Sequence, residues 1–391
     1  MATSKLANAI NETTKAGVTD VEVFNDAVAG AGLDLEPYQA GSDFTPWGKS
    51  FTQNPKQLSD YLDSVAVKYA NVFIKVAKVQ NPLSRFKRGL IPYGGKLESV
   101  VFDTISPKVF RPDLVDGAEN PFTQNFGRVV GHTYTTYFDI ESTNTIQDTV
   151  DTIYFQNLTQ FNTFVYGKIM QLVNGAMLDE FYNMKLTLAK PIADQMISTD
   201  TVTNIKDLGK KILEWSRKFK YFRRDSNYDR VNQATMVEDI EVIMPVKYSV
   251  DMDIDFLMNA FNPEIFRNTK VHVTEVDEIP DVWEYNKAHT VVQKDIDEGF
   301  VDKREHPIGS VIEQGAIARP NATDATKTLD GSKVGAIILD RDALQAWDSL
   351  PLTLSTINNP KKRYTNIFAN QKTALMFVQS LNSKAIMCNF D

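Results

Sequence analysis

The chain has 391 residues, enough for about two or three compact units, and its 42% hydrophobic and 24% charged residues are ordinary for a globular protein. Its 42 Lys and Arg against 50 Asp and Glu residues give a net charge of −8, which argues against a surface built throughout to neutralise phosphates. The single cysteine, Cys388, excludes an internal disulfide framework and a cysteine-based zinc finger. No apolar run predicts a membrane span or a signal peptide, so we expect a soluble, unsecreted protein.

The first 80 residues predict helices separated by breakers. Residues 4–14 and 20–28 read as short amphipathic helices, and Gly30 and Gly32 begin a turn-rich stretch. A longer helix over residues 59–79 carries one apolar stripe, made of Leu62, Val65, Ala66, Tyr69, Phe73 and Val76. Because these pieces show little core of their own, the segment is interpreted as an arm.

Residues 94–142 predict a long β-hairpin. The stretch is rich in Val, Phe, Tyr and Thr and is interrupted by Gly and Pro. Its returning half alternates, so one face is expected to carry Val130, His132, Tyr134, Thr136, Phe138 and Ile140. Such a hairpin has little room for a core of its own.

The strongest helical signal runs from about residue 146 to 188. Apolar residues recur there at helical spacing, and no proline occurs between Ser142 and Pro191. A helix of that length would be about 60 Å long. We expect it to cross the back of a flat molecule.

The remainder predicts mixed helix and strand. An amphipathic helix from Ile205 to Phe222 carries a basic run that continues just past its end. The sequence VEDIEVIM reads as a strand in which Ile240, Val242 and Met244 alternate with charged neighbours. Residues 277–335 are polar and loop-rich, and SKAIMCNF reads as a closing strand. The basic run is either the solvated face of an amphipathic helix, which is the favoured interpretation, or a DNA-facing surface. Its residues are Lys210, Lys211, Arg217, Lys218, Lys220, Arg223 and Arg224.

The sequence contains no complete catalytic, cofactor-binding or metal-binding motif. Asp251, Asp253 and Asp255 resemble the start of a calcium loop, but Phe256 and Asn262 occupy positions where that loop needs Gly and Glu. The four histidines are scattered. Cys388 is interpreted as an inert core thiol and His132 as an interface or packing residue rather than a general base. The sequence therefore predicts neither catalytic residues nor a cofactor.

The order of these elements resembles the major capsid protein of tailed bacteriophages, with its Hong Kong 97-type α+β fold. Two stretches make the resemblance more specific to podoviruses of Gram-positive hosts, such as streptococcal and staphylococcal phages: residues 81–103 and residues 237–262. In the first stretch the resembling residues are Asn81, Pro82, Leu83, Phe86, Lys87, Tyr93, Gly94 and Glu98. Within this family interpretation, Arg111 and Arg128 are further candidates for contacts between subunits.

The resemblance implies a division of the chain into five parts. They are an N-terminal helical arm (1–80), an extended loop with its lead-in (81–142), a spine helix with a peripheral domain (143–276), an axial domain (277–370) and a C-terminal strand that returns to the peripheral domain (371–391). It also implies a non-enzymatic head protein that self-assembles as pentamers and hexamers into an icosahedral shell around double-stranded DNA. Scaffolding and portal proteins would be its partners, DNA contact would be weak and non-specific, and the virion capsid would be assembled in the bacterial cytoplasm.

Two alternatives stay open from the sequence. An encapsulin-like compartment would use the same shell fold but hold enzyme cargo. A cytosolic hydrolase would place its active site in residues 277–370, whose polar loops motivate the idea, although nucleophile, metal and phosphate-binding motifs are missing.

Overall fold

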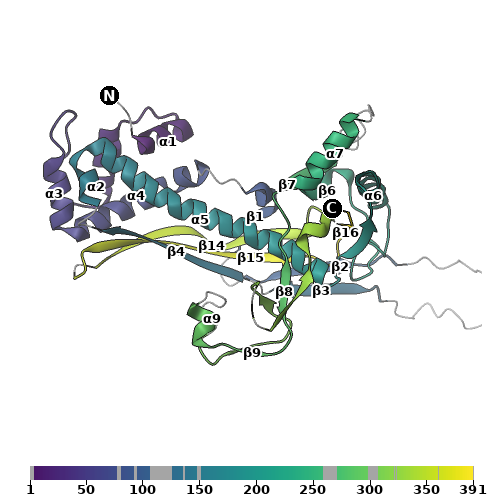
Figure 1. The fold of residues 1–391 in the computed structure, drawn as a ribbon. Coiled ribbons are helices and arrows are strands. Elements are labelled where there is room, and N and C mark those ends of the chain that lie inside the picture. Colours follow the sequence, from purple (N-terminus) through teal and green to yellow (C-terminus); the bar gives the residue numbers. More distant parts are fainter. Residues whose placement is uncertain are drawn as a thin grey trace, which may run out of the picture.

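The computed structural model has an elongated form in which a long helix lies over a sheet, with helices at one end and a second sheet at the other (Figure 1). The structure describes residues 4–76, 81–91, 95–105, 126–134, 137–147, 151–258, 271–297, 307–320, 322, 324–359 and 361–390. No helix in these ranges combines the length and the apolar character that a membrane crossing needs.

Four helices form a compact helical body near the N-terminus. They are α1 (Lys5–Thr14), α2 (Asp20–Gly30), α3 (Thr45–Gln53) and α4 (Pro55–Lys75). The Ser4 side chain caps α1, and Thr19 and Glu22 form a capping box at the start of α2. The expectation that this segment has little core is wrong, because Phe24, Phe51 and Tyr61 are fully buried within it.

The long helix α5 (Leu158–Ala193) has 36 residues, which corresponds to a length of about 54 Å. It begins later than residue 146, because Ile146 belongs to a strand and Asn157 caps the helix by accepting from the Thr159 N–H. A short 3₁₀ helix, η2 (Asp151–Gln156), precedes it. The helix also continues through Pro191, since a proline in the last turn removes only one hydrogen bond.

A four-stranded sheet lies along α5 in the order β1-β14-β15-β4. Its strands are β1 (Lys87–Leu90), β14 (Leu344–Asn359), β15 (Tyr364–Phe377) and β4 (Tyr137–Gln147). Strand β4 pairs with β15 along eleven residues, from Tyr137 opposite Ala374 to Gln147 opposite Tyr364. The returning half of the predicted hairpin is therefore divided, and its second part belongs to this sheet.

A five-stranded sheet forms the other end of the molecule, in the order β5-β16-β13-β6-β7. The strands are β5 (Ser198–Val202), β16 (Ser383–Cys388), β13 (Val334–Asp340), β6 (Ile240–Pro245) and β7 (His272–Val276). On one face it packs on α6 (Ile205–Lys218) and α7 (Val246–Met258), and on the other it meets α5. The short helices η3 (Val237–Asp239) and η4 (Gly331–Lys333) precede β6 and β13.

These sheets group the chain differently from the five parts expected from the sequence. Strand β13, within residues 277–370, lies between β16 and β6 and joins the sheet of the preceding part. Strands β14 and β15 instead pair with β4 and β1. The predicted strand is confirmed as β6, and all six of its residues are buried, Glu241 among them, because both faces of that sheet are covered.

Two small units complete the fold. One is the antiparallel hairpin of β2 (Leu97–Phe102) and β3 (Val129–Tyr134). A short 3₁₀ helix, η1 (Pro82–Phe86), comes directly before β1 in the chain and leads towards this hairpin. A small β unit lies below the long sheet in Figure 1 and has its own buried cluster around Tyr285 and Ile312. Its elements are β8 (Val282–Tyr285), β9 (His289–Thr290), α9 (Gln293–Asp297), β10 (Val311–Ile312), β11 (Ile317–Ala318) and β12 (Ala325–Leu329).

Candidate assembly surfaces

The lead-in to the hairpin is fixed to the long helix. Asn81 accepts a hydrogen bond from the Leu83 N–H at 2.9 Å, which starts η1, and its amide donates to Glu180 Oε1 at 3.3 Å. Leu83 and Phe86 are fully buried in the cluster between α5 and the five-stranded sheet. Pro82 occupies the first turn of η1, where its missing N–H costs nothing. The resembling residues of this segment thus anchor the start of the extended part of the chain.

Lys87 joins three elements through charge. Its Nζ lies 2.9 Å from Glu180 on α5 and 3.1 Å from Asp348 on β14, and Gln371 on β15 donates to Glu180 at 2.7 Å. Burial opposes the charge on Lys87, but the two carboxylates prevail and raise its pKa. Sequence reasoning missed Glu180, Asp348 and Gln371. The one signal was a carboxylate at position 180 within the predicted apolar stripe of the long helix.

A second ion pair attaches η1 to the five-stranded sheet. Arg85 lies 2.6 Å from Glu241, whose side chain is fully buried on β6. Burial raises the pKa of Glu241 to about 7, although Arg85 acts in the opposite direction. His272 on β7 approaches the same carboxylate at 3.3 Å, and burial lowers the pKa of that histidine.

The hairpin is held at its base through His132. Its Nε2 lies 2.9 Å from Asp229 Oδ2, and the Gln379 amide contacts the same ring at 3.0 Å. The Ser380 hydroxyl donates to Asp229 rather than to His132. In a catalytic triad the serine hydroxyl must bond the histidine, so this group is a structural contact, in agreement with the packing role expected for His132.

Two further contacts fix the same base. Arg128 donates to the carbonyl oxygens of Asp229 at 2.7 Å and Arg230 at 3.4 Å. Asp103 accepts from the Asn232 N–H at 3.0 Å and lies 3.4 Å from Arg224. The Asn232 hydrogen bond and then the Arg224 charge lower the pKa of Asp103. The base is therefore positioned by charge and hydrogen bonds rather than by a core.

The opposite face of the hairpin is apolar and exposed. Phe102 on β2 is 71% exposed and pairs directly with Val129 on β3, which is 53% exposed, while Val100 on the same face is 56% exposed. Glu98 lies on this face as well. In the described part of the chain these side chains are left facing outward. An exposed apolar face on a coreless hairpin is typical of a surface that another chain covers.

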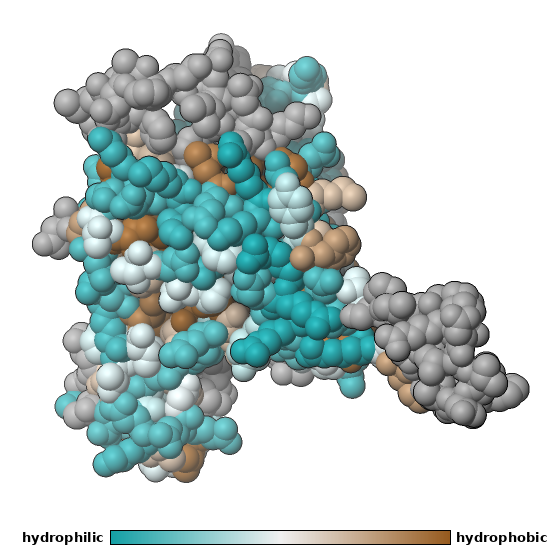
Figure 2. Space-filling view, turned by 90° about the vertical axis from the view of Figure 1, so that its right-hand side faces the viewer, coloured by the Kyte–Doolittle hydropathy of each residue, from teal (hydrophilic) through white to brown (hydrophobic). Residues whose placement is uncertain are grey.

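The basic residues of α6 and the loop after it are largely neutralised within the chain. Figure 2 shows that the face bearing these elements is mainly hydrophilic, with isolated hydrophobic groups. The ion pairs are Lys210 with Asp207, Lys211 with Asp200 and Glu214, Lys218 with Glu214, Arg223 with Asp225 and Arg224 with Asp103. Lys218 also lies over the Trp215 ring at 4.5 Å. Arg217 and Lys220 are exposed.

Three of the residues expected to take part in subunit contacts lie outside the described ranges. They are Tyr93, Gly94 and Arg111. Their expected part in subunit contacts therefore stays a prediction.

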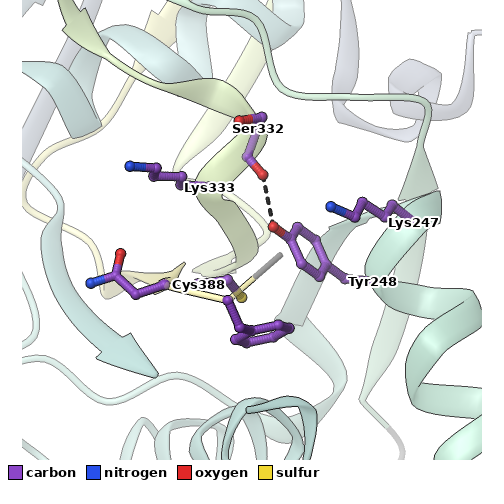
Figure 3. Close-up of a pocket in the computed structure, with 7 residues that line it drawn as sticks. Lys247, Tyr248, Ser332, Lys333 and Cys388 are labelled. Carbon is purple, nitrogen blue, oxygen red and sulfur yellow. Dashed lines mark hydrogen bonds between the residues drawn. The ribbon is translucent and has the colours of Figure 1, made fainter. Parts of the chain in front are cut away.

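A pocket beside the C-terminal strand has none of the chemistry of an active site. It has a volume of about 370 Å³ and lies between α7, η4 and the end of β16 (Figure 3). Tyr248 donates to the Ser332 carbonyl at 2.7 Å, and burial raises the pKa of Tyr248 to about 12 and that of Cys388 to about 11. The thiol is thus protonated at neutral pH, as expected for an inert core residue. The described residues contain no group of His, Cys, Asp and Glu side chains arranged to hold a metal ion.

Comparison with known proteins gives a consistent result. A model of Phi29-like phage major capsid proteins matches residues 23–387. The major capsid protein of Bacillus phage B103 is 24% identical over 268 residues, covering 64% of this chain and 58% of its own length, so this chain spans little more than half of that relative. A chain in the capsid structure of Staphylococcus phage Andhra superposes with a TM-score of 0.60 at 14% identity, covering 79% of this chain and 84% of that one. A chain in the structure of head fiber and inner core protein gp22 of native bacteriophage P68 superposes with a TM-score of 0.64 at 16% identity. The match covers 79% of this chain and 85% of that one.

Proposed function

Because the family match extends over most of its length, this chain belongs to the Phi29-like phage major capsid proteins, and we propose that it self-assembles as pentamers and hexamers into an icosahedral shell around double-stranded DNA. The similarity expected from residues 81–103 and 237–262 is confirmed at the level of the family and of its Hong Kong 97-like fold. The protein is then a component of the virion capsid, and we propose that shells assemble in the cytoplasm of the bacterial host.

The observation that carries this proposal is the exposed apolar face of the β2–β3 hairpin. One face is fixed to the chain through His132, Arg128 and Asp103, while Phe102 and Val129 on the other face remain open to solvent. A monomer gains nothing from this arrangement. A neighbouring subunit that covered the face would remove apolar side chains from water, at about 25 cal/mol for each Å² buried.

The two alternatives, a hydrolase and a compartment with enzyme cargo, differ in the support they receive. Family and curated relatives are structural capsid proteins rather than enzymes, which confirms the expectation of a non-enzymatic protein and leaves the hydrolase without support. A compartment with enzyme cargo shares the shell architecture and is distinguished by the contents of the particle. The placement of residues 277–370 at the capsomer centres stays a prediction.

DNA, scaffolding and portal proteins remain proposed partners. The ion pairs around α6 leave few uncompensated cations on that helix, which favours weak, non-specific DNA contact over tight binding. Weak contact suits a shell that must first take up and later release its genome. Arg217 and Lys220, both exposed, are the residues of the basic run with most freedom to meet phosphates.

Electron microscopy of the expressed chain tests the proposal. We expect closed particles or capsomer-sized rings, alone or with a scaffolding protein, and nucleic acid rather than enzyme inside particles taken from infected cells. Deleting residues 108–124, which lie outside the described ranges at the expected hairpin tip, should leave a folded subunit that forms no closed shells. A strictly monomeric wild-type protein at high concentration contradicts the proposal. Normal shells from the deletion variant contradict the role of the hairpin alone.

A further inference from the structure

Three large apolar side chains are exposed on the loop between α6 and η3, and we call them the loop patch. Tyr221 is 70% exposed, Phe222 is 66% exposed and Met236 is 78% exposed. Figure 2 shows hydrophobic groups on the otherwise hydrophilic face that bears this loop. Tyrosine, phenylalanine and methionine are enriched where proteins bind one another. The loop patch therefore has the composition of a docking surface for another protein.

Hydrogen bonds of the backbone hold the loop patch in a fixed shape. The Thr235 N–H donates to the Phe219 carbonyl at 2.7 Å, and Arg223 and Gln233 exchange two backbone hydrogen bonds of 3.1 Å. Phe219 is fully buried in the cluster between α6 and the five-stranded sheet. The apolar side chains are thus presented from a hydrogen-bonded ribbon that is anchored in the core.

The outer face of the β2–β3 hairpin has chemistry that matches the loop patch. It carries the exposed apolar residues Val100, Phe102 and Val129. Glu98 lies on the same face, exposed and without an ion pair among the described residues. Lys220, directly before the loop patch in the chain, is likewise exposed and forms no ion pair in the described structure. Two apolar surfaces that carry opposite charges complement each other.

These two surfaces of one chain face away from each other. The inner face of the hairpin is fixed to the loop, where Asp103 accepts from the Asn232 N–H at 3.0 Å, so the outer face points away from the same loop. Neither surface is complementary to itself, since Glu98 and Lys220 give each a charge of one sign. A contact between different surfaces of two copies is heterologous, and it repeats from copy to copy until a ring closes.

We infer that the loop patch receives the outer face of the hairpin of a second copy, with Glu98 opposite Lys220, an inference that rests on the proposed self-assembly. Each copy then docks its hairpin on one neighbour and receives the hairpin of another, as in a closed ring. Large aromatic side chains bury about 150–250 Å² each, so the loop patch offers on the order of 400 Å². One partner in a standard interface buries about 800 Å², so other contacts between the copies complete this one.

Duplex DNA fits the loop patch less well. Its bases are stacked inside the helix, and its phosphates are bound by charged and polar groups rather than by exposed apolar side chains. Single strands could stack their bases on Tyr221 and Phe222, an outcome that the second experiment separates from protein docking. The inference assigns Lys220 to a protein contact and leaves Arg217 as the other exposed cation of the basic run.

The first experiment exchanges the two charges in full-length chains. Glu98→Lys and Lys220→Glu each place like charges opposite one another, so each should lower the shell yield at least about tenfold. The double variant restores opposite charges and should assemble like wild type. The control combines Glu98→Lys with Lys361→Glu, an exposed charge in the turn after β14, and should stay defective. Normal shells from either single variant, no recovery in the double variant, or equal recovery in the control overturn the inference.

The second experiment tests the direction of the contact by mixing two variants. Phe102→Ser disrupts the hairpin surface and Phe222→Ser disrupts the loop patch, so neither variant alone should form shells. Both positions are exposed, so urea denaturation of each unassembled variant should give the stability of wild type. In an equal mixture, the intact hairpin of Phe222→Ser can dock on the intact loop patch of Phe102→Ser. We expect heterodimers that grow no further, measured by native mass spectrometry.

Three outcomes of the mixing experiment separate the explanations. Shells from Phe222→Ser alone, or a mixture without heterodimers, overturn the inference. Binding of a single-stranded oligonucleotide by the unassembled wild type that Phe222→Ser abolishes, together with normal shells of that variant, assigns the loop patch to nucleic acid and overturns it too. Failure of wild type to form shells contradicts the proposed function instead.

Discussion

The helical body buries its large apolar side chains, whereas the β2–β3 hairpin leaves several of them exposed. In the body, Phe24 contacts five other aromatic rings, among them Phe161 of α5. In the hairpin, Phe102 and Val129 pair with each other and stay exposed. The body is thus stabilised within one chain, whereas the hairpin has its base fixed and the apolar side chains of its outer face exposed. Stability and assembly are therefore expected to respond to mutations in different regions.

The largest effect on folding is expected in the helical body. Phe161 is fully buried and stacks on Phe51 at 5.5 Å, so Phe161→Ala removes its burial and leaves a cavity at the junction of α5 with the body. The free energy of unfolding should fall by about 3–5 kcal/mol. Urea denaturation of the unassembled chain measures this. Tyr182→Ala, on the same helix but 50% exposed, is the control and should stay within about 0.5 kcal/mol. Equal losses would show that the aromatic cluster does not support the body.

The next effect concerns Glu241, which ties the lead-in of the hairpin to the five-stranded sheet. Its pKa is about 7 in the folded chain against 4.5 for an unperturbed carboxyl. Folding therefore disfavours the charged form. The stability that this group contributes is complete below pH 4.5 and is lost as the pH rises through 7, by about 3 kcal/mol at most.

The variant Glu241→Gln removes this titration. We compare the free energy of unfolding of the variant with that of wild type, by denaturation of the unassembled chain at pH 5 and at pH 8. The difference should favour the variant more at pH 8 than at pH 5. Glu238→Gln, an exposed change three residues earlier, should show the same difference from wild type at both values. A Glu241→Gln difference that is independent of pH would mean that Arg85 keeps Glu241 charged throughout.

The sequence predicted local patterns well and contacts between distant segments poorly. The alternation around His132 was correct: Val130, His132 and Tyr134 are half-buried and their neighbours exposed, because the period of a strand is a local property. The core of the helical body was missed, because its aromatic residues come from separate helices and loops and meet only around Phe161. The burial of Glu241 could not be predicted, since no local signal shows that a second layer covers its side of the sheet.

The candidate surfaces follow the same rule. Lys87 was singled out by resemblance alone, and its partners Glu180 and Asp348 lie 93 and 261 positions away in the chain. A charged residue within an apolar stripe, such as Glu180, was the single usable signal.

The smallest effect on stability, and the sharpest test of the comparison, is expected from Phe102→Ser on the outer face of the hairpin. Phe102 is 71% exposed, so the free energy of unfolding of the unassembled chain should change by less than about 0.5 kcal/mol. Shell yield should nevertheless collapse, because each copy loses apolar area that its neighbour covers. The matched control is Val67→Ser on α4, where the side chain is 75% exposed on the helical body. Light scattering during assembly should distinguish the two variants. If Val67→Ser stops assembly and Phe102→Ser does not, the neighbouring chain docks on the helical body instead of the hairpin.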